Sequence, residues 1–325
     1  VRQLPELCSS SADELAAYVG ADEVLLVDNA TTGVNAVLRS LPLKRGDRVL
    51  ALTHVYPAVH QALRYVAERA GARIEQVPLE IPADPDRLLE RLEEALPAEL
   101  AVLDHITSGS GLVLPIEEMV ALCRRNGTPV LVDGAHAPGQ VPLNLRELGA
   151  TWYTGNCHKW LCAPKGVAFL HAAAEGRASL QPTVISHAYG DLRGSFEFTG
   201  TRDYTPWLSL PATLAFRREL GDRAVRDYNH RLALQAREIL LDRLGTVATG
   251  PASMVGSLVC VRAPESVGEA TWEGASLAAR RLWEEERIEV PFFPFAGALW
   301  LRVSAQVYNE AQEYERLAEL LCRPV

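Results

Sequence analysis

The sequence predicts an α/β fold in which a large domain, built on a mainly parallel β-sheet of the seven-stranded type, precedes a small C-terminal α/β domain. Two observations lead to this prediction. Short apolar runs alternate with longer amphipathic stretches through the first two thirds of the chain, and the short runs are apolar on both faces, as parallel strands covered by helices are. A second α/β pattern begins near residue 221. We therefore expect residues 1–220 to form the large domain and residues 221–325 the small one.

The elements of the large domain follow from these runs. The expected strands cover residues 24–27, 48–52, 73–77, 101–103 and 129–132. Apolar residues at helical spacing between them predict helices over 34–41, 58–70, 86–96 and 116–125. Crossovers between parallel strands are right-handed, so the functional loops should lie at the carboxyl ends of the strands.

The rhythm changes after residue 150. Two further strands (151–154 and 166–171) and a helix (207–219) are expected, followed by a long charged helix over 222–244. The small domain should contain a strand (257–262), a helix (277–287), a strand (299–304) and a last helix that ends at residue 321.

Composition excludes several classes of protein. The chain of 325 residues has a formal net charge of −9 and no basic tract, which argues against nucleic acid as a partner. No apolar run approaches the roughly 20 residues that span a bilayer, and Val1 to Ser10 lacks the pattern of a secretory signal, so we expect a cytoplasmic protein without membrane contact. The six cysteines form no CxxC pair, and His54 and His60 form no HExxH motif, so neither a disulfide framework nor a metal site is expected.

Lysine is rare, which narrows the search for an amine nucleophile. Only Lys44, Lys159 and Lys165 occur, and the first and last lie in polar turns. Lys159 directly follows an expected strand, between His158 and Trp160. Partial desolvation there would lower its pKa and suit it to form a Schiff base with an aldehyde. The alternative is a structural lysine that caps a turn.

Two further segments could bind other parts of a cofactor that carries such an aldehyde. Asp133 ends an expected strand, where a carboxylate can pair with a protonated pyridine nitrogen; the alternative is a helix cap or turn former. The segment Asn29–Val34 joins an expected strand to a helix, and its small and hydroxyl residues would expose backbone N–H groups to a phosphate. A plain N-cap is the alternative for this segment.

These segments carry a resemblance to a known family. The chain resembles the class V aminotransferase group of fold-type I pyridoxal-phosphate enzymes, and within it the isopenicillin N epimerase-like branch. The resemblance runs through Asn29–Asn35, Asp104–Ser108, Asp133–His136, Gly155–Trp160, Phe198–Asp203 and Leu301–Asn309. Members of this family usually begin with a further stretch before the region that resembles residues 1–20, so we expect the sequence to be a shortened view of a longer chain.

The resemblance implies pyridoxal 5'-phosphate as the cofactor and assigns roles to its ligands. Lys159 would form the Schiff base and then move protons at the substrate's α-carbon. Asp133 would hold the pyridine nitrogen, with His136 and Ser108 near the phenolic oxygen of the ring. The expected phosphate ligands are Thr31, Thr32, Asn156 and His158.

The resemblance also implies how the substrate and a second subunit contribute. His54 would stack on the ring, with Tyr56 as the fallback, and Tyr56 would also contact the substrate. Arg302 would clamp the substrate carboxylate with its planar guanidinium. Thr201 would reach the phosphate of the neighbouring subunit, which implies a homodimer with shared active sites.

The reaction is left with several candidates. The leading one is epimerisation or racemisation: Lys159 removes the α-proton, and the proton returns from the same face or from the opposite one, where Tyr56 or His187 would be the second acid–base group. The alternative is a carbon–sulfur β-lyase of the cysteine-conjugate or desulfurase-like type. A transaminase, a decarboxylating deaminase and an inactive binding protein are further alternatives. A persulfide-forming desulfurase needs a cysteine shortly before the carboxylate arginine, and residues 282–302 contain none.

Other enzyme classes lack their motifs. A nicotinamide-dependent oxidoreductase would carry a GxGxxG between a strand and a helix, and none is present. A serine hydrolase would carry a GxSxG elbow, which is also missing. Neither class is therefore expected.

Overall fold

The structure, a computed structural model, describes residues 3–323, and its chain forms two compact units. Unit 1 consists of residues up to 78 with segments 86–106 and 115–222, and unit 2 consists of segments 79–85, 107–114 and residues from 223 onward. The two short segments belong to unit 2 because backbone hydrogen bonds tie them to it: the Ala83 N–H donates to the Thr249 carbonyl, and the Val113 N–H donates to the Met254 carbonyl.

Unit 1 is built on a seven-stranded sheet with the order β1-β7-β6-β5-β4-β2-β3. Strands β6, β5, β4, β2 and β3 run parallel, whereas β7 is antiparallel to both β6 and β1. The prediction of a mainly parallel seven-stranded sheet is confirmed. The strand bounds are β1 Leu25–Val27, β2 Arg48–Leu52, β3 Arg73–Val77, β4 Leu100–Asp104, β5 Val130–Asp133, β6 Trp152–Asn156 and β7 Ala168–Ala172.

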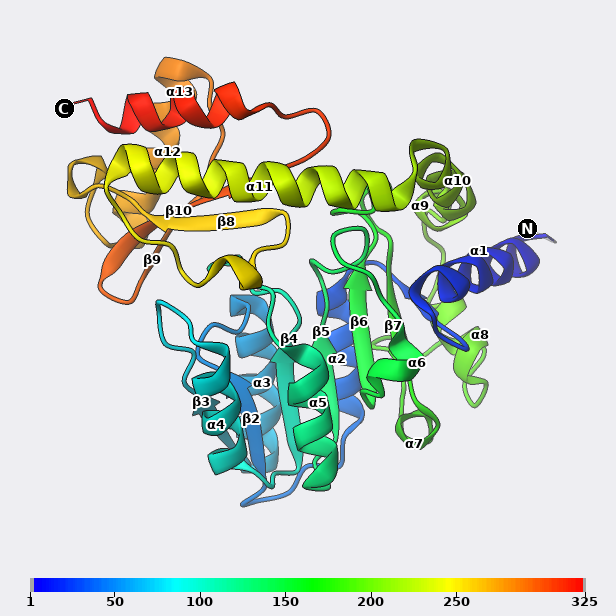
Figure 1. The fold of residues 1–325 in the computed structure, drawn as a ribbon. Coiled ribbons are helices and arrows are strands. Elements are labelled where there is room, and N and C mark those ends of the chain that lie inside the picture. Colours follow the sequence, from blue (N-terminus) through cyan, green and yellow to red (C-terminus); the bar gives the residue numbers. More distant parts are fainter. Residues whose placement is uncertain (1–2, 324–325) are drawn as a thin grey trace. The chain divides into compact units, whose positions relative to one another are not determined.

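Helices cover both faces of this sheet. Figure 1 shows α2 (Ala30–Ser40) and α3 (Pro57–Ala70) behind it, and α4 (Pro85–Ala95) and α5 (Ile116–Arg125) in front. The step from β2 to β3 runs in one direction along the sheet, and the step from β3 to β4 runs in the other. Because both crossovers are right-handed, their helices α3 and α4 lie on opposite faces. The apolar residues of α2 and α3 pack with those of the strands in one core.

Three features of unit 1 differ from the prediction or were not predicted. The helix predicted over 207–219 is two helices, α9 (Thr205–Leu208) and α10 (Leu210–Leu220), which meet at Ser209. Pro211 explains the break, since it has no N–H to donate and therefore suits the first turn of a new helix. Helix α1 (Leu4–Val19) was not predicted. The short helices α6 (Leu145–Leu148), α7 (Ala174–Arg177) and α8 (Leu192–Glu197) lie in the connections.

Unit 2 contains a three-stranded antiparallel sheet with the order β8-β10-β9. Its helices α11, α12 and α13 and its strands enclose a separate apolar core. The bounds are α11 Asp222–Leu244, β8 Leu258–Arg262, α12 Trp272–Glu286, β9 Phe292–Phe295, β10 Ala298–Ser304 and α13 Ala311–Leu321, with short 3-10 turns at Ala252–Met254 and Glu265–Val267.

Two elements of unit 2 differ from the prediction. Strand β9 was not predicted, and its Pro294 is tolerated because β9 is an edge strand. Helix α12 begins five residues before its predicted start, at Trp272, since the Thr271 side chain caps it by accepting the N–H of Gly274 at 3.0 Å. None of the helices between residues 3 and 323 is long and apolar enough to cross a membrane.

Candidate functional site

The carboxyl edge of the parallel strands in unit 1 gathers several polar side chains. The register pairs Asp104 of β4 with Asp133 of β5, and Asp133 with Thr154 of β6, so these three side chains share one face of the sheet. Asp133 is buried, and its Oδ1 accepts the Ala135 N–H at 3.0 Å. Burial raises the pKa of Asp133, while the Ala135 N–H and the charge of Lys159 act in the opposite direction.

Lys159 lies against His136, which follows β5. The distance from Lys159 Nζ to His136 Nε2 is 3.0 Å, and Trp160 Nε1 lies 3.2 Å from His136 Nδ1. An indole N–H only donates, so His136 Nδ1 is the acceptor and a neutral His136 carries its proton on Nε2, toward the lysine. Asp133, His136 and Lys159 are thus brought together as a unit, and Trp160, which the sequence analysis did not assign a role, orients the histidine.

The first turn of α2 is held against the end of β6. Asn29 caps the helix by accepting the Thr32 N–H at 2.9 Å, and Asn156 Oδ1 accepts the Ala30 N–H at 2.8 Å. The amide NH2 of Asn156 therefore remains a donor for a ligand. The positive end of the helix dipole and the hydroxyl of Thr31 lie at this turn, an arrangement that suits a phosphate, whereas the Thr32 hydroxyl donates to Asn29 Oδ1 at 3.2 Å.

Gly33 allows this close approach. A Cβ at residue 33 would lie 3.0 Å from Thr154 Cβ and closer still to Thr154 Oγ1. Only glycine lets the start of α2 pack so tightly on β6.

The remaining predicted ligands of unit 1 lie on connecting segments. His158 hydrogen-bonds through Nδ1 to the Val167 carbonyl at 3.0 Å, so that its Nε2 is left for a ligand, and burial is the main reason that its pKa is lowered. Burial also lowers the pKa of His54, which follows β2. Tyr56 is 40% exposed, and His187 is exposed with its ring 5.4 Å from that of Phe198.

Thr201 is exposed, and its neighbour Arg202 anchors the segment. The Arg202 guanidinium pairs with Asp28, in the loop before α2, and lies 4.3 Å from the centroid of the Trp207 ring. The segment that carries Thr201 is therefore fixed to the loop that leads into α2. A reach of Thr201 to a second subunit stays a prediction.

Ser108 and Arg302 both belong to unit 2. Arg302 Nη1 donates to the Ser108 carbonyl, and the guanidinium carbon lies 5.0 Å from the centroid of the Phe293 ring. Burial lowers the pKa of Arg302, and among the described residues no group accepts a hydrogen bond from its Nε. A buried guanidinium with donor capacity left is a fitting receptor for a carboxylate.

Sequence reasoning missed a second polar layer on the other face of the sheet. His105 Nδ1 lies 2.8 Å from the hydroxyl of Tyr153, and burial lowers the pKa of His105 to about 4. The sequence analysis also assigned no role to Asp104. A signal was available, because β4 and β5 both end in an aspartate after an apolar run.

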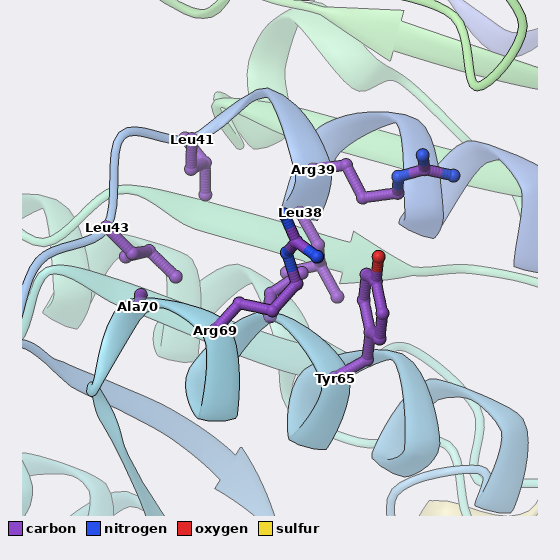
Figure 2. A pocket seen from close by; sticks show the side chains of 8 residues that line it. Leu38, Arg39, Leu41, Leu43, Tyr65, Arg69 and Ala70 are labelled. Carbon is purple, nitrogen blue, oxygen red and sulfur yellow. The ribbon is translucent and has the colours of Figure 1, made fainter.

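One cavity of unit 1 lies away from these residues. It has a volume of about 360 Å³ and lies between the carboxyl-terminal halves of α2 and α3, where Leu38, Arg39, Tyr65 and Arg69 line it (Figure 2). None of the predicted site residues contributes to its wall. The candidate site is therefore defined by its side chains at the sheet edge and not by this cavity.

The comparison with known families agrees with these residues. The sequence model of the family described as "Aminotransferase class-V" matches residues 7–268. The chain belongs to the class V aminotransferase family. This membership confirms both the resemblance inferred from the motifs and the prediction of pyridoxal phosphate as the cofactor.

Curated relatives of this chain include an epimerase and a desulfhydrase. An isopenicillin N epimerase of Streptomyces clavuligerus is 34% identical over 99% of this chain and 85% of its own length. A putative L-cysteine desulfhydrase 1 of Oryza sativa subsp. japonica is also 34% identical, over 91% of this chain and 70% of its own length. These two relatives are named for different reactions.

Solved structures confirm the fold of this chain. The cystine C–S lyase C-DES, in complex with its product cysteine persulfide, superposes with a TM-score of 0.83 at 23% identity and covers 98% of this chain and 87% of its own. A cysteine desulfurase from Thermococcus onnurineus superposes with a TM-score of 0.82 at 18% identity, over 98% and 84% of the two chains.

The side chains at the sheet edge fit pyridoxal phosphate. Three groups lie along one sheet edge: the amine of Lys159, the buried carboxylate of Asp133 and the start of α2. The start of α2 can approach β6 closely because residue 33 has no Cβ. These are the three groups that an aldehyde, a pyridine nitrogen and a phosphate require.

Proposed function

We propose that this chain is a pyridoxal-phosphate enzyme in which Lys159 removes the α-proton of an amino-acid substrate. The observation that carries the proposal is the contact of Lys159 Nζ with His136 Nε2 at 3.0 Å, next to the buried Asp133. When bound, pyridoxal phosphate supplies an electron sink that makes the α-proton acidic.

The residues around Lys159 support its role as a base. Trp160 fixes the ring of His136, and the contact of His136 Nε2 with Lys159 Nζ at 3.0 Å holds the amine in one direction. Asp133 would bind the protonated pyridine nitrogen and keep the ring electron-poor. Asp133 ends β5 and His136 lies three residues after it, so the same strand orders them relative to each other.

The phosphate would be held by the start of α2. Thr31 offers its hydroxyl there, Asn156 offers its amide NH2, and the helix dipole favours an anion; Thr32 would bind the phosphate by turning its hydroxyl away from Asn29. His158 would contribute through Nε2, and its pKa would rise beside a phosphate. In unit 2, Arg302 would bind the substrate carboxylate, with Ser108 and Phe293 fixing the guanidinium.

Epimerisation is our first candidate for the reaction. It is supported by the epimerase relative, which aligns with 99% of this chain. Lys159 would take the α-proton, and the proton would return to the same carbon. An opposite-face return needs a second acid–base group, for which Tyr56 and His187 are the proposed residues, with His54 stacked on the ring.

A carbon–sulfur β-lyase is the second candidate and is supported by the desulfhydrase relative. Here Lys159 removes the same proton, and the thiol then leaves from the β-carbon. A persulfide route through Cys157 is not favoured, because Cys157 is fully buried and desolvation raises its pKa.

We further propose a homodimer in which Thr201 reaches the phosphate of the second subunit. The exposure of Thr201, on a segment that Arg202 anchors to Asp28, supports this. Mixing a Thr201→Ala subunit with a Lys159→Ala subunit should yield heterodimers with one intact site. A monomer at working concentration would contradict the proposal.

Borohydride trapping tests the role of Lys159. Protein loaded with pyridoxal phosphate should absorb visible light, and borohydride should fix the cofactor on Lys159. Lys159→Ala should lose both properties, whereas the control Lys165→Ala, at an exposed turn, should keep them. Trapping on a different lysine would refute the assignment.

Deuterated water separates the two reactions. Amino acids and cysteine thioethers are incubated with the enzyme, and the products are analysed by NMR and mass spectrometry. Deuterium at the α-carbon without bond cleavage supports epimerisation, and pyruvate with a released thiol supports the lyase. A keto acid formed together with the aminated cofactor would refute both in favour of transamination.

A further inference from the structure

Two aspartates end neighbouring strands of the unit 1 sheet. In the parallel register of β4 and β5, Asp104 lies opposite Asp133. Side chains of directly paired residues point to the same face, and neighbouring strands are about 4.8 Å apart. The two carboxyl groups are therefore adjacent in a part of the sheet where both residues are buried, with exposed fractions of 2% and 5%.

The two carboxyl groups have unequal surroundings. Asp133 Oδ1 accepts the Ala135 N–H, and the charge of Lys159 also favours an ionised Asp133. Asp104 Oδ2, in contrast, is buried without a hydrogen-bond partner anywhere in the described part of the chain. An anion in that position would be uncompensated, whereas a carboxylic acid could donate a proton to its neighbour.

Other titratable groups nearby do not supply a counter-charge for Asp104. On β6, Tyr153 hydrogen-bonds to His105 on the opposite face. On the other side, the register of β2 and β4, carried on past Ala51, places the uncharged Thr53 beside Asp104, and burial lowers the pKa of His54, the next residue. Burial raises the pKa of Asp104 well above its ordinary value, and the charge of Asp133 raises it further.

We propose that Asp104 is held as a neutral carboxylic acid that donates its O–H to Asp133, so that the pair carries one negative charge, located on Asp133. Asp104 is then a positioning residue. Its hydrogen bond and that of the Ala135 N–H orient the Asp133 carboxylate, and a single charge avoids the repulsion of two buried anions. The orientation of Asp133 toward a pyridine nitrogen rests on the proposed function, whereas the shared proton does not.

The proposal has a defined linkage to pH. The unfolded chain ionises Asp104 above about pH 4, whereas the folded chain keeps it protonated. Stability should therefore fall as pH rises above that value, until the pH passes the raised pKa of the folded state. The unfolding equilibrium constant should increase about tenfold per pH unit from this residue alone. Asp104→Asn should lose this contribution.

Infrared spectroscopy of the protein without added cofactor tests the protonation state. At pH 7, the difference between wild type and Asp104→Asn should contain the C=O stretch of a protonated carboxylic acid. The matched control Asp242→Asn, at an exposed position, should change only ionised carboxylate bands. A wild-type difference spectrum without the protonated band, or equal pH slopes for the two proteins between pH 5 and 8, would overturn the proposal.

Two further measurements keep the test decisive. If Asp104→Asn does not fold, wild-type protein with 13C-labelled aspartate carboxyls should shift the protonated band, and an unshifted or missing band would overturn the proposal. For the role toward Asp133, Asp104→Leu should bind pyridoxal phosphate at least about tenfold more weakly than Asp104→Asn, whose amide can still donate. Equal affinities would refute the positioning role. A wild type that binds no pyridoxal phosphate would refute the proposed function and leave the infrared result standing.

Discussion

Gly33→Ala tests whether the phosphate end of the site depends on the tight packing of α2 on β6. The added Cβ would lie 3.0 Å from Thr154 Cβ and closer to Thr154 Oγ1. Thr154 cannot turn away without cost, because its hydroxyl donates to the Phe169 carbonyl at 2.8 Å in the buried interior. The helix must therefore move.

The expected magnitude follows from two opposing effects. Overpacking in a close-packed interior costs about 1–3 kcal/mol, whereas replacing glycine by alanine inside a helix gains up to about 1 kcal/mol. We expect Gly33→Ala to lower the free energy of unfolding by about 1–2 kcal/mol. Because Thr31 and Thr32 lie in the turn that moves, the affinity for pyridoxal phosphate should also fall, by about tenfold.

A double-mutant cycle provides the assay. Urea unfolding of the protein without cofactor is followed by circular dichroism for wild type, Gly33→Ala, Thr154→Ala and the double variant, and cofactor affinity is measured by absorbance. Thr154→Ala removes the Oγ1 that Gly33→Ala would meet, so the two changes should couple by about 1 kcal/mol. The reasoning is refuted if Gly33→Ala changes stability by less than about 0.5 kcal/mol in both backgrounds.

Three other predictions concern different parts of unit 1. Burial lowers the pKa of His105 to about 4, so only the unfolded chain binds a proton at this residue as pH falls from about 6.5 to 4. Over this range the wild type should lose up to about 3 kcal/mol of unfolding free energy that His105→Asn does not lose. Equal losses for the two proteins in urea unfolding would contradict this prediction. Arg217 is buried, and its partners are Asp222 and the Gly139 carbonyl. Arg217→Met should therefore lower the free energy of unfolding in urea by about 3 kcal/mol, and a loss below about 1 kcal/mol would show that the ion pair contributes little. Cys157→Ala should keep turnover within about twofold of wild type, since the thiol is buried and its pKa raised; loss of turnover in a correctly folded variant would restore a cysteine route.

Most of the fold could be predicted because local patterns determine it. Strands β2 and β3 and helices α5 and α11 have the bounds that the sequence predicted, since an apolar run or an amphipathic repeat defines both ends of each element. The elements that escaped prediction are α1, β9 and the short helices α6, α7 and α8. Strand β9 pairs only with β10 and contains a proline, so its pairing and not its composition makes it a strand.

The composition of the candidate site was predictable for a different reason. Lysine is rare in this chain, and Lys159, Asp133 and the start of α2 follow strands whose carboxyl ends must meet at one sheet edge. Residue types at the ends of the predicted strands suited this cofactor class, and the family resemblance of the same segments named it.

The sequence by itself determined the α/β fold, the family and the cofactor, because apolar periodicity and short motifs are local properties of the chain. Only the tertiary structure decided which polar groups touch. It placed Trp160 on His136, paired Asp104 with Asp133 across the register, and tied Arg302 to the Ser108 carbonyl. These contacts depend on strand register and burial, which no local pattern encodes, and they decide where protons and charges lie in the site.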